Sequence, residues 1–244
     1  MSKRQNFFLS HLLISVFAAL LVMSFVFFVW YPSPLAKAVG VTHIFLMLLI
    51  IDVILGPLLG FLVFKEGKKT LKFDLTVIIL IQISALGYGV YSIAQARPVW
   101  IVFNADKFEL VRNNEMQTNA DTAVEQEFSR PSLLYPQFVG VKQAENAEQR
   151  QVEQMSSLLN GTSLAQFPER YTPLKRLSHD LRQEARNISE LYEVNSKLEV
   201  EKILKENPHA TAWLPLETYA LPLVVLIDKD KAEIVKIVDL RYSK

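Results

Sequence analysis

The chain has 244 residues, half of them hydrophobic, with a formal net charge of +1 and no cysteine. This length allows one or two domains, and the absence of cysteine excludes disulfides and Cys-ligated metal sites. Residues 1–98 carry a net charge of +5 and residues 99–244 a net charge of −4. Neither part has the dense basic patch that nucleic-acid binding requires, so we expect no nucleic acid as a partner.

Three long apolar runs occupy the first 95 residues. They cover residues 7–30, 41–64 and 75–94, and each reaches the length of about 20 residues that a helix needs to cross a bilayer. A cleaved signal peptide is the alternative for the first run. The apolar core of a signal peptide is about 7–15 residues long, however, and this run is longer. We therefore predict a three-helix transmembrane region over residues 1–96.

Basic residues next to the apolar runs indicate how the helices are oriented. The first connection, residues 32–40, has one basic residue, whereas the start of the chain and the second connection are rich in them. Those residues are Lys3, Arg4, Lys65, Lys68, Lys69 and Lys72. Since basic connections stay in the cytoplasm, the N-terminus is expected there. Three crossings then put residues 97–244 outside, in the periplasm, for a multi-pass protein of a bacterial inner membrane.

The remaining part, residues 97–244, has the mixed pattern of an α+β domain. Two β-rich runs flank a turn at residues 104–106 and predict a hairpin, and residues 113–121 predict a loop. Stretches with few helix-breaking residues predict helices, and two apolar runs near the end of the chain predict strands. The expected helices are 144–159, 172–192 and 196–205, and the expected strands are 99–103, 108–111, 223–227 and 234–240. The fold class is thus a membrane α-helical region plus a C-terminal α+β extracytoplasmic domain.

Motifs that would indicate catalysis are missing from the sequence. The four histidines form no HxxxH or HExxH pair, which argues against a catalytic zinc site. The sequence also lacks a GxSxG nucleophile motif and a phosphate-binding loop. We therefore expect no catalytic residue, no cofactor and no metal, and we interpret the chain as a protein other than an enzyme.

The most informative segment lies in the second apolar run. Asp52 is near the middle of the expected span, where an ionisable side chain is costly and by default points to a function. Gly56 and Gly60 form a GxxxG pair, which lets another helix approach closely. Pro57 has no backbone N–H and so frees the carbonyl group of Val53. Asp52, Gly56, Pro57 and Gly60 are therefore our candidate residues for binding a partner helix.

Two other interpretations of this segment stay open. The four residues can serve packing within the bundle, because the third run offers polar groups at a similar depth and a small-residue face. The polar groups are Gln82 and Ser84, and the small residues are Ala85 and Gly89. Transfer of protons or ions is the other interpretation, and it would rest on the single carboxylate of Asp52.

Several segments together resemble the TfpX/TfpZ family of type IV pilin accessory proteins. They are the short basic start, the three spans, DVILGPLLGFLVFK at 52–65, RPVWIVF at 97–103 followed by DKF at 106–108, and IVDLR at 237–241. The resemblance covers nearly the whole chain. It implies a chaperone that binds and stabilises a cognate type IV pilin subunit in the inner membrane before assembly, and it implies no catalytic residues.

The implied function would explain both the apolar spans and the outer domain. A pilin that waits for assembly has an apolar N-terminal helix in the membrane and a globular head outside it. A chaperone for it needs a helix-packing surface in the bilayer and a domain outside. The alternative is a membrane-bound enzyme that modifies pilin or envelope glycans. A signalling receptor is disfavoured because the expected cytoplasmic parts are short. Which pilin is bound, and in what oligomeric state, stays open.

Overall fold

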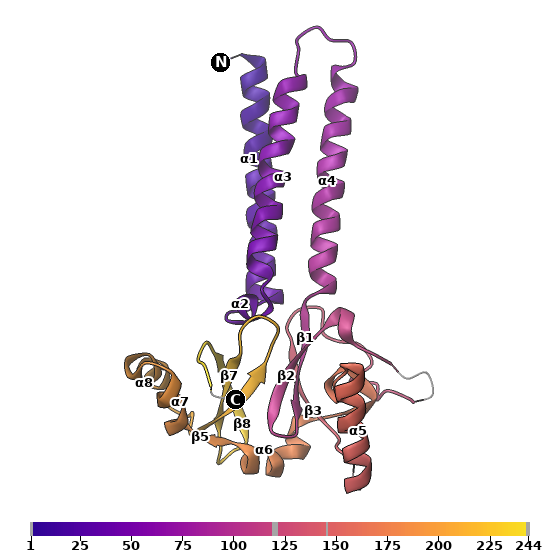
Figure 1. Cartoon of the computed structure of the whole chain (residues 1–244). Coiled ribbons are helices and arrows are strands. Elements are labelled where there is room, and N and C mark those ends of the chain that lie inside the picture. The colour runs from indigo at the N-terminus through magenta and orange to yellow at the C-terminus, as the bar shows by residue number, and fades with distance from the viewer. Residues whose placement is uncertain (1, 119–121, 145, 243–244) are drawn as a thin grey trace. The chain divides into compact units, whose positions relative to one another are not determined.

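The computed structural model describes residues 2–118, 122–144 and 146–242, and its backbone divides into two compact units. The first unit contains the chain up to Ala36 and Gly40–Ala96, and the second contains Lys37–Val39 and the chain from Arg97 onward. The architecture is three long apolar helices followed by an α+β half-barrel domain (Figure 1). The predicted three-helix region and the predicted α+β domain are both confirmed.

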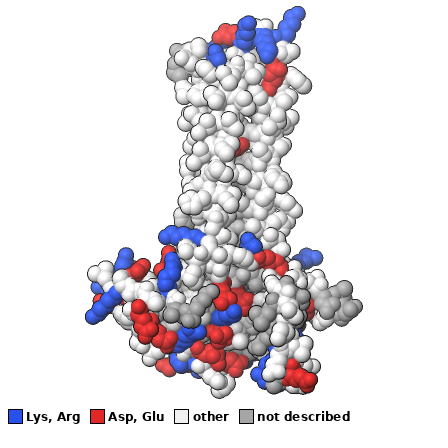
Figure 2. All heavy atoms as spheres, in the orientation of Figure 1, with Lys and Arg blue, Asp and Glu red and all other residues white. Residues whose placement is uncertain are grey.

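The first unit consists of three long helices, each apolar and long enough to cross a membrane. They are α1 (Lys3–Phe25), continued by one π-helical turn η1 (Val26–Trp30), α3 (Val41–Val63) and α4 (Leu71–Gln95), and a short helix α2 (Leu35–Val39) precedes α3. α3 packs against both α1 and α4. On the face that Figure 2 shows, the surface between the two ends of the bundle is almost free of charged side chains. The chain is therefore a multi-pass membrane protein.

The second unit is built on one mixed sheet. The strand order is β4-β3-β1-β2-β6-β7-β8, and β5 pairs with β6 beside this path. The strands are β1 (Pro98–Asn104), β2 (Lys107–Arg112), β3 (Gln137–Val141), β4 (Tyr171–Thr172), β5 (Arg186–Asn187), β6 (Ala212–Glu217), β7 (Leu223–Asp228) and β8 (Glu233–Val238). The predicted hairpin is the antiparallel pair β1–β2, and the two predicted C-terminal strands are the antiparallel pair β7–β8.

Short helices complete the α+β unit. The α-helices are α5 (Ala147–Asn160), α6 (Ser178–Glu184), α7 (Leu191–Val194) and α8 (Lys197–Glu206). Single turns of 3₁₀-helix are η2 (Asn113–Glu115), η3 (Leu164–Gln166), η4 (Pro168–Arg170), η5 (Leu174–Leu177) and η6 (Ile188–Glu190). α5 begins after the capping side chain of Asn146 and ends at Gly161, whose φ of 65° is left-handed. Of the predicted loop 113–121, residues 119–121 lie outside the described residues.

Two buried clusters form the core of this unit. One contains Trp100 and Tyr171, whose ring centroids are 5.4 Å apart, and the hydroxyl of Tyr171 donates to the carbonyl oxygen of Ala165. The other contains Trp213 and Leu226. Every residue of β7 is buried, so both faces of this strand are covered. Burial of such large side chains is the main favourable contribution to folding.

The single helix predicted over residues 172–192 is wrong. The structure breaks this stretch into η5, α6, β5, η6 and α7. The helix ends at Ala185, whose ψ of 121° is extended, and the next two residues pair with β6. There the indole N–H of Trp213 donates to the carbonyl oxygen of Asn187 at 2.8 Å. A tertiary contact from β6 therefore overrides the local helical preference.

Candidate functional site in the helical bundle

The four candidate residues for partner binding lie on the middle and later turns of α3. Asp52, Gly56 and Gly60 are four residues apart, so they lie along one face of the helix. Gly56, Pro57 and Gly60 are buried, whereas the side chain of Asp52 is half-buried. The structure thus places all four on one helix but gives them different neighbours.

The two glycines allow α1 and α4 to approach α3 closely. A Cβ atom on Gly56 would lie 2.0 Å from Oε1 of Gln82 in α4. A Cβ atom on Gly60 would lie 2.9 Å from the ring of Phe7 and 3.4 Å from the ring of His11 in α1. Any residue larger than glycine at position 56 would require the Gln82 side chain to move. The close approach that GxxxG predicts is therefore made here by the helices of the same chain.

A polar cluster of His11, Ser15, Gln82 and the backbone of Asp52 connects the three long helices. The Gln82 amide donates to Oγ of Ser15 at 3.0 Å and to the carbonyl oxygen of Asp52 at 3.2 Å. Its Oε1 atom lies 2.9 Å from Nε2 of His11. Both donor hydrogens and the acceptor of this amide are therefore engaged. Such bonds position helices in a bilayer, where an unpaired amide is costly.

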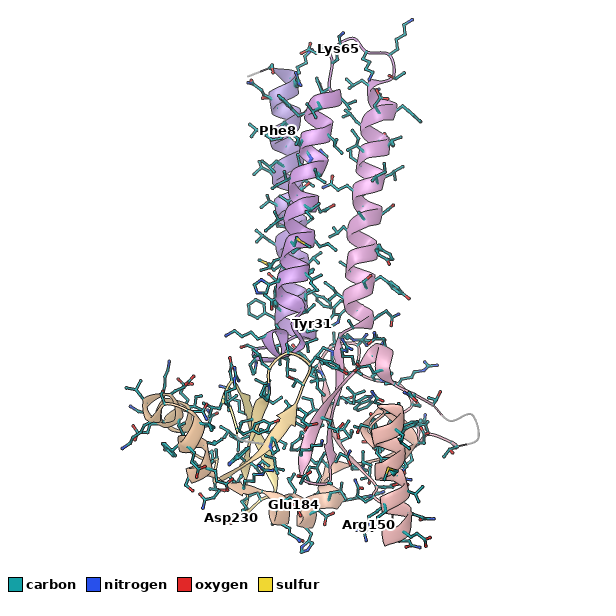
Figure 3. The ribbon with its side chains drawn as sticks, viewed as in Figure 1. Phe8, Tyr31, Lys65, Arg150, Glu184 and Asp230 are labelled. Carbon is teal, nitrogen blue, oxygen red and sulfur yellow. The ribbon has the colours of Figure 1, made fainter. Side chains whose placement is uncertain are left out.

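Hydrogen bonds also connect the helices near both ends of the bundle. Nε of Arg4 donates to the carbonyl oxygen of Phe61 at 2.7 Å, and the guanidinium group stacks over the ring of Phe61. At the opposite end, the hydroxyl of Tyr31 donates to the carbonyl oxygen of Ile93 at 3.1 Å. Figure 3 shows Tyr31 at one end of the bundle and Lys65, in the basic connection, at the other.

An apolar groove of about 440 Å³ lies between α3 and α4, and Asp52 is its acidic residue. The polar part of its lining is Asp52 and Gln82, and the remainder is apolar or glycine. The groove is lined by Ile44, Met47, Leu48, Ile51, Asp52, Leu55, Gly56, Leu59, Ile78, Ile81, Gln82, Ala85 and Leu86. The cluster thus forms part of one wall of a surface that a lipid chain or another helix can fill.

The sequence anticipates part of this arrangement. It points to Gln82 as a partner of Asp52, and the structure places the Gln82 amide against that residue. Ser84 is exposed, and Gly89 packs against Leu48 rather than against either glycine of α3. The charge and the glycine pair of the second apolar run do not point to His11 or Ser15. The signal available was their spacing of four residues in a span with few polar groups, which puts both on one face.

The α+β unit has a separate charged cluster at the end of β2. The Arg112 guanidinium lies over the ring of Tyr219 and forms an ion pair with Glu115 at 2.5 Å. The hydroxyl of Tyr219 also donates to Glu115. Burial raises the pKa of Glu115, but hydrogen bonds from Arg112 and Tyr219 outweigh it and hold that pKa below its usual value. Burial and the bond to Glu115 raise the pKa of Tyr219 to about 12. This cluster connects β2 to the segment after β6.

Metal binding finds no support in the part of the chain that the structure describes. No group of three or more His, Asp or Glu side chains there could hold a metal ion.

Comparison with known proteins places the chain among fimbrial assembly proteins. The family model for "Fimbrial assembly protein FimB" matches residues 1–40. The fimbrial assembly protein of serogroups C1 and C2 of Dichelobacter nodosus is 39% identical over 108 residues, which cover 82% of that protein and 43% of this chain. The chain belongs to the FimB family.

Two longer matches extend the relationship over most of the chain. The fimbrial assembly proteins of serogroups I and E1 of Dichelobacter nodosus are each 29% identical to this FimB-family chain, over 232 and 229 residues. Each match covers 90% of this chain and 89% of the relative. Both units therefore have counterparts in these relatives. No solved structure matches this chain.

Proposed function

We propose that this FimB-family protein is a type IV pilus accessory protein that binds its cognate pilin subunit in the inner membrane and stabilises it before assembly. It acts as a chaperone and not as an enzyme. The observation that carries the proposal is the apolar groove between α3 and α4 with Asp52 on its wall. The names of its relatives, which are fimbrial assembly proteins, support the pilus as the context.

The groove has the properties needed to bind the apolar helix of a pilin. Its wall offers aliphatic side chains for van der Waals contact, which is what holds helices together in lipid. Asp52 adds a polar group that a partner helix with a donor would satisfy. Binding of the native subunit lowers the population of pilin that is open to proteolysis. The α+β unit then contacts the pilin head, and the shared bilayer raises the effective concentration of both partners.

The expected orientation, with the N-terminus in the cytoplasm and the α+β unit in the periplasm, is part of the proposal. It is supported by the basic residues of the second connection, because basic connections stay in the cytoplasm. The contacts of the first connection support three crossings, with that connection and the α+β unit on one side of the membrane. The carbonyl oxygen of Ala38 accepts hydrogen bonds from the backbone of Ala220 at 2.7 Å and from Oγ1 of Thr218 at 3.2 Å. Lys37 forms an ion pair with Asp239. A connection that bonds to the α+β unit lies on the same side of the membrane as that unit.

Single cysteines test this orientation cleanly, because the chain has none of its own. We expect Ser33→Cys and Lys202→Cys to react with a membrane-impermeant thiol reagent in spheroplasts. Lys69→Cys and Ser2→Cys should react only after the membrane is opened. All four positions are exposed. Reaction of Lys69→Cys in intact spheroplasts, with Lys202→Cys protected, would reverse the orientation.

Deletion of the gene tests the function. The abundance of the cognate pilin and the number of surface pili should fall several-fold, while pilin transcription stays unchanged. An unrelated pilin in the same cell serves as the control and should keep its level. An enzyme would instead leave pilin abundant with an altered mass. Normal pilin abundance, mass and piliation in the deletion strain would contradict the proposal.

Photo-crosslinking tests the groove itself. A photoreactive residue at Ile81, which lines the groove and is 63% exposed, should capture pilin through its N-terminal helix. The matched control is Leu13, which is 69% exposed on α1 and is not part of the groove lining. Equal capture from the two positions would show that pilin does not occupy the groove, even if deletion shows that pilin depends on this protein.

A further inference from the structure

Three consecutive apolar side chains lie exposed in one loop of the α+β unit. Leu133, Leu134 and Tyr135 are 76%, 51% and 52% exposed. Pro131 and Pro136 flank them and are half-buried, so the loop is held at both ends. Exposed apolar side chains that adjoin one another mark a surface that another apolar phase covers. We refer to residues 133–135 as the apolar loop.

The apolar loop is tied to the point where the chain leaves the last transmembrane helix. Nη2 of Arg97 donates to the carbonyl oxygen of Ser132, the residue before the loop, at 3.2 Å. Helix α4 ends at Gln95, two residues before Arg97. Two extended residues span at most about 7 Å. The backbone of Arg97, which holds the loop, is therefore within a few ångströms of the end of the span.

The strand register independently indicates that the apolar loop lies near the start of β1. β1 begins at Pro98, just after the span, and β3 begins just after the apolar loop. The two strands are parallel, with Trp100 opposite Gln137. Neighbouring strands are about 4.8 Å apart, so the starts of β1 and β3 share one edge of the sheet. The chain that follows α4 and the chain that follows the apolar loop therefore enter the sheet at the same edge.

The end of α4 carries the side chains typical of a membrane interface. Tyr88 and Tyr91 are 74% and 59% exposed within its last two turns, and tyrosine prefers the level of the lipid headgroups. We propose that the apolar loop inserts into the adjacent headgroup and acyl boundary of the bilayer, with a lipid surface as its partner. Its two leucines reach the acyl chains, and Tyr135 stays at the interface. The loop then acts as a second, shallow membrane contact of the α+β unit.

A single cysteine at Leu134 measures the depth of the loop in the full-length protein. The Leu134→Cys variant, labelled with an environment-sensitive fluorophore, is reconstituted into vesicles of phosphatidylethanolamine and phosphatidylglycerol. Leu198→Cys, at a position 80% exposed on α8, is the aqueous control, and Tyr88→Cys is the interfacial control. We expect blue-shifted emission for Leu134→Cys. Quenching by a lipid that carries a shallow nitroxide should be several-fold stronger than for Leu198→Cys.

Two results would overturn the inference. The first is emission and quenching at Leu134→Cys equal to those of Leu198→Cys. The second is shielding of Leu134→Cys that appears only when pilin is added to the vesicles, because the loop would then contact a protein and not lipid. Substitution of an exposed side chain leaves folding intact, so both results are interpretable.

Discussion

In the transmembrane unit glycine and polar side chains make close contacts between the helices, whereas in the α+β unit two buried clusters of apolar side chains form the core. Gly56 and Gly60 give neighbouring helices room, and the Gln82 amide bonds to two other helices. In the second unit, Trp213 and Leu226 are buried in one apolar cluster. The same chain thus uses two kinds of packing.

The difference follows from the solvent of each unit. Lipid is as apolar as leucine, so apolar side chains gain little by leaving it, and close fit and hydrogen bonds must hold the helices together. Water drives apolar side chains of the α+β unit into its core. Added bulk should therefore harm the first unit most, and lost bulk should harm the second.

The largest effect is expected from bulk at Gly56. In the Gly56→Leu variant, the new Cβ atom would lie 2.0 Å from Oε1 of Gln82. Moving Gln82 away would break its three hydrogen bonds and separate α4 from α3. We expect a several-fold loss of folded protein in the membrane, measured by immunoblot and by gel filtration in mild detergent.

Gly87→Leu is the matched control for this substitution. Gly87 lies in α4, and nothing lies within 4 Å of a Cβ atom placed there. Its substitution should leave the amount of folded protein unchanged. If the two leucine variants accumulate equally, close packing at Gly56 does not hold α3 and α4 together.

Loss of bulk in the α+β unit should have the next largest effect. Leu226 is fully buried between Trp213 and other apolar residues, so Leu226→Ala leaves a cavity. Such truncations cost about 2–5 kcal/mol in the free energy of unfolding. Leu198→Ala, at an exposed position, should cost less than about 0.5 kcal/mol. Urea unfolding of the detergent-solubilised chain, followed by tryptophan fluorescence, measures both, and similar midpoints would argue against this core.

The membrane spans were predictable from sequence because the bilayer sets the length of a crossing helix. The hairpin of β1 and β2 was predictable from a local turn between apolar runs. The strand β6 was not predicted, and its Pro215 argues against a central strand. β6 accommodates this residue because β5 pairs only up to Trp213 and β2 pairs only from Leu216 onward. On this edge of β6, Pro215 therefore lies in the gap between β5 and β2, and on the other edge it lies opposite Val224 of β7.

The candidate site was predictable on α3 and not on α1. An acidic residue amid apolar ones is visible in the sequence, and Asp52 is a candidate for that reason. The place of His11 and Ser15 depends on which face of α1 meets α4, and that choice is made by packing of three helices. Likewise, the helix break at Ala185 depends on β6, which is distant in the chain. The local sequence pattern does not reveal contacts between segments that are distant in the chain.

Changes at Asp52 separate the two roles of the polar cluster. The Gln82 amide bonds to the backbone carbonyl of Asp52, so a side-chain substitution leaves that bond in place. Asp52→Asn should therefore accumulate normally and weaken pilin capture from the groove. Asp52→Leu should weaken capture further, by several-fold.

Crosslinking yield at Ile81, normalised to the amount of protein, is the measurement for both variants. Full activity of Asp52→Leu would show that the carboxylate is dispensable. Disappearance of both variants from the membrane would show that Asp52 serves packing within the bundle and not partner binding.

The smallest effect is expected from pH at the cluster of Arg112, Glu115 and Tyr219. The pKa of Glu115 is lower in the folded state than its usual value, so the folded state favours the charged carboxylate. Its contribution to stability is present at neutral pH and is lost as pH falls below about 4.3 toward the folded pKa. The contribution of Tyr219 to stability depends on pH in the opposite direction. Its pKa of about 12 exceeds the usual value of 10, so its contribution is lost as pH rises through this interval.

Glu115→Gln removes the acid-sensitive part of this cluster, and Glu206→Gln, at an exposed position of α8, is the control. At neutral pH we expect Glu115→Gln to lower the free energy of unfolding by about 1 kcal/mol, as for a partly exposed ion pair. The difference in Tm between this variant and the unmodified protein should shrink as pH falls from about 6 to about 3, because the unmodified carboxylate then gains a proton. A difference that stays constant over this range would mean that the hydrogen bonds of Glu115 do not depend on its charge. The connection between β2 and the segment after β6 would then rest on stacking of Arg112 over Tyr219.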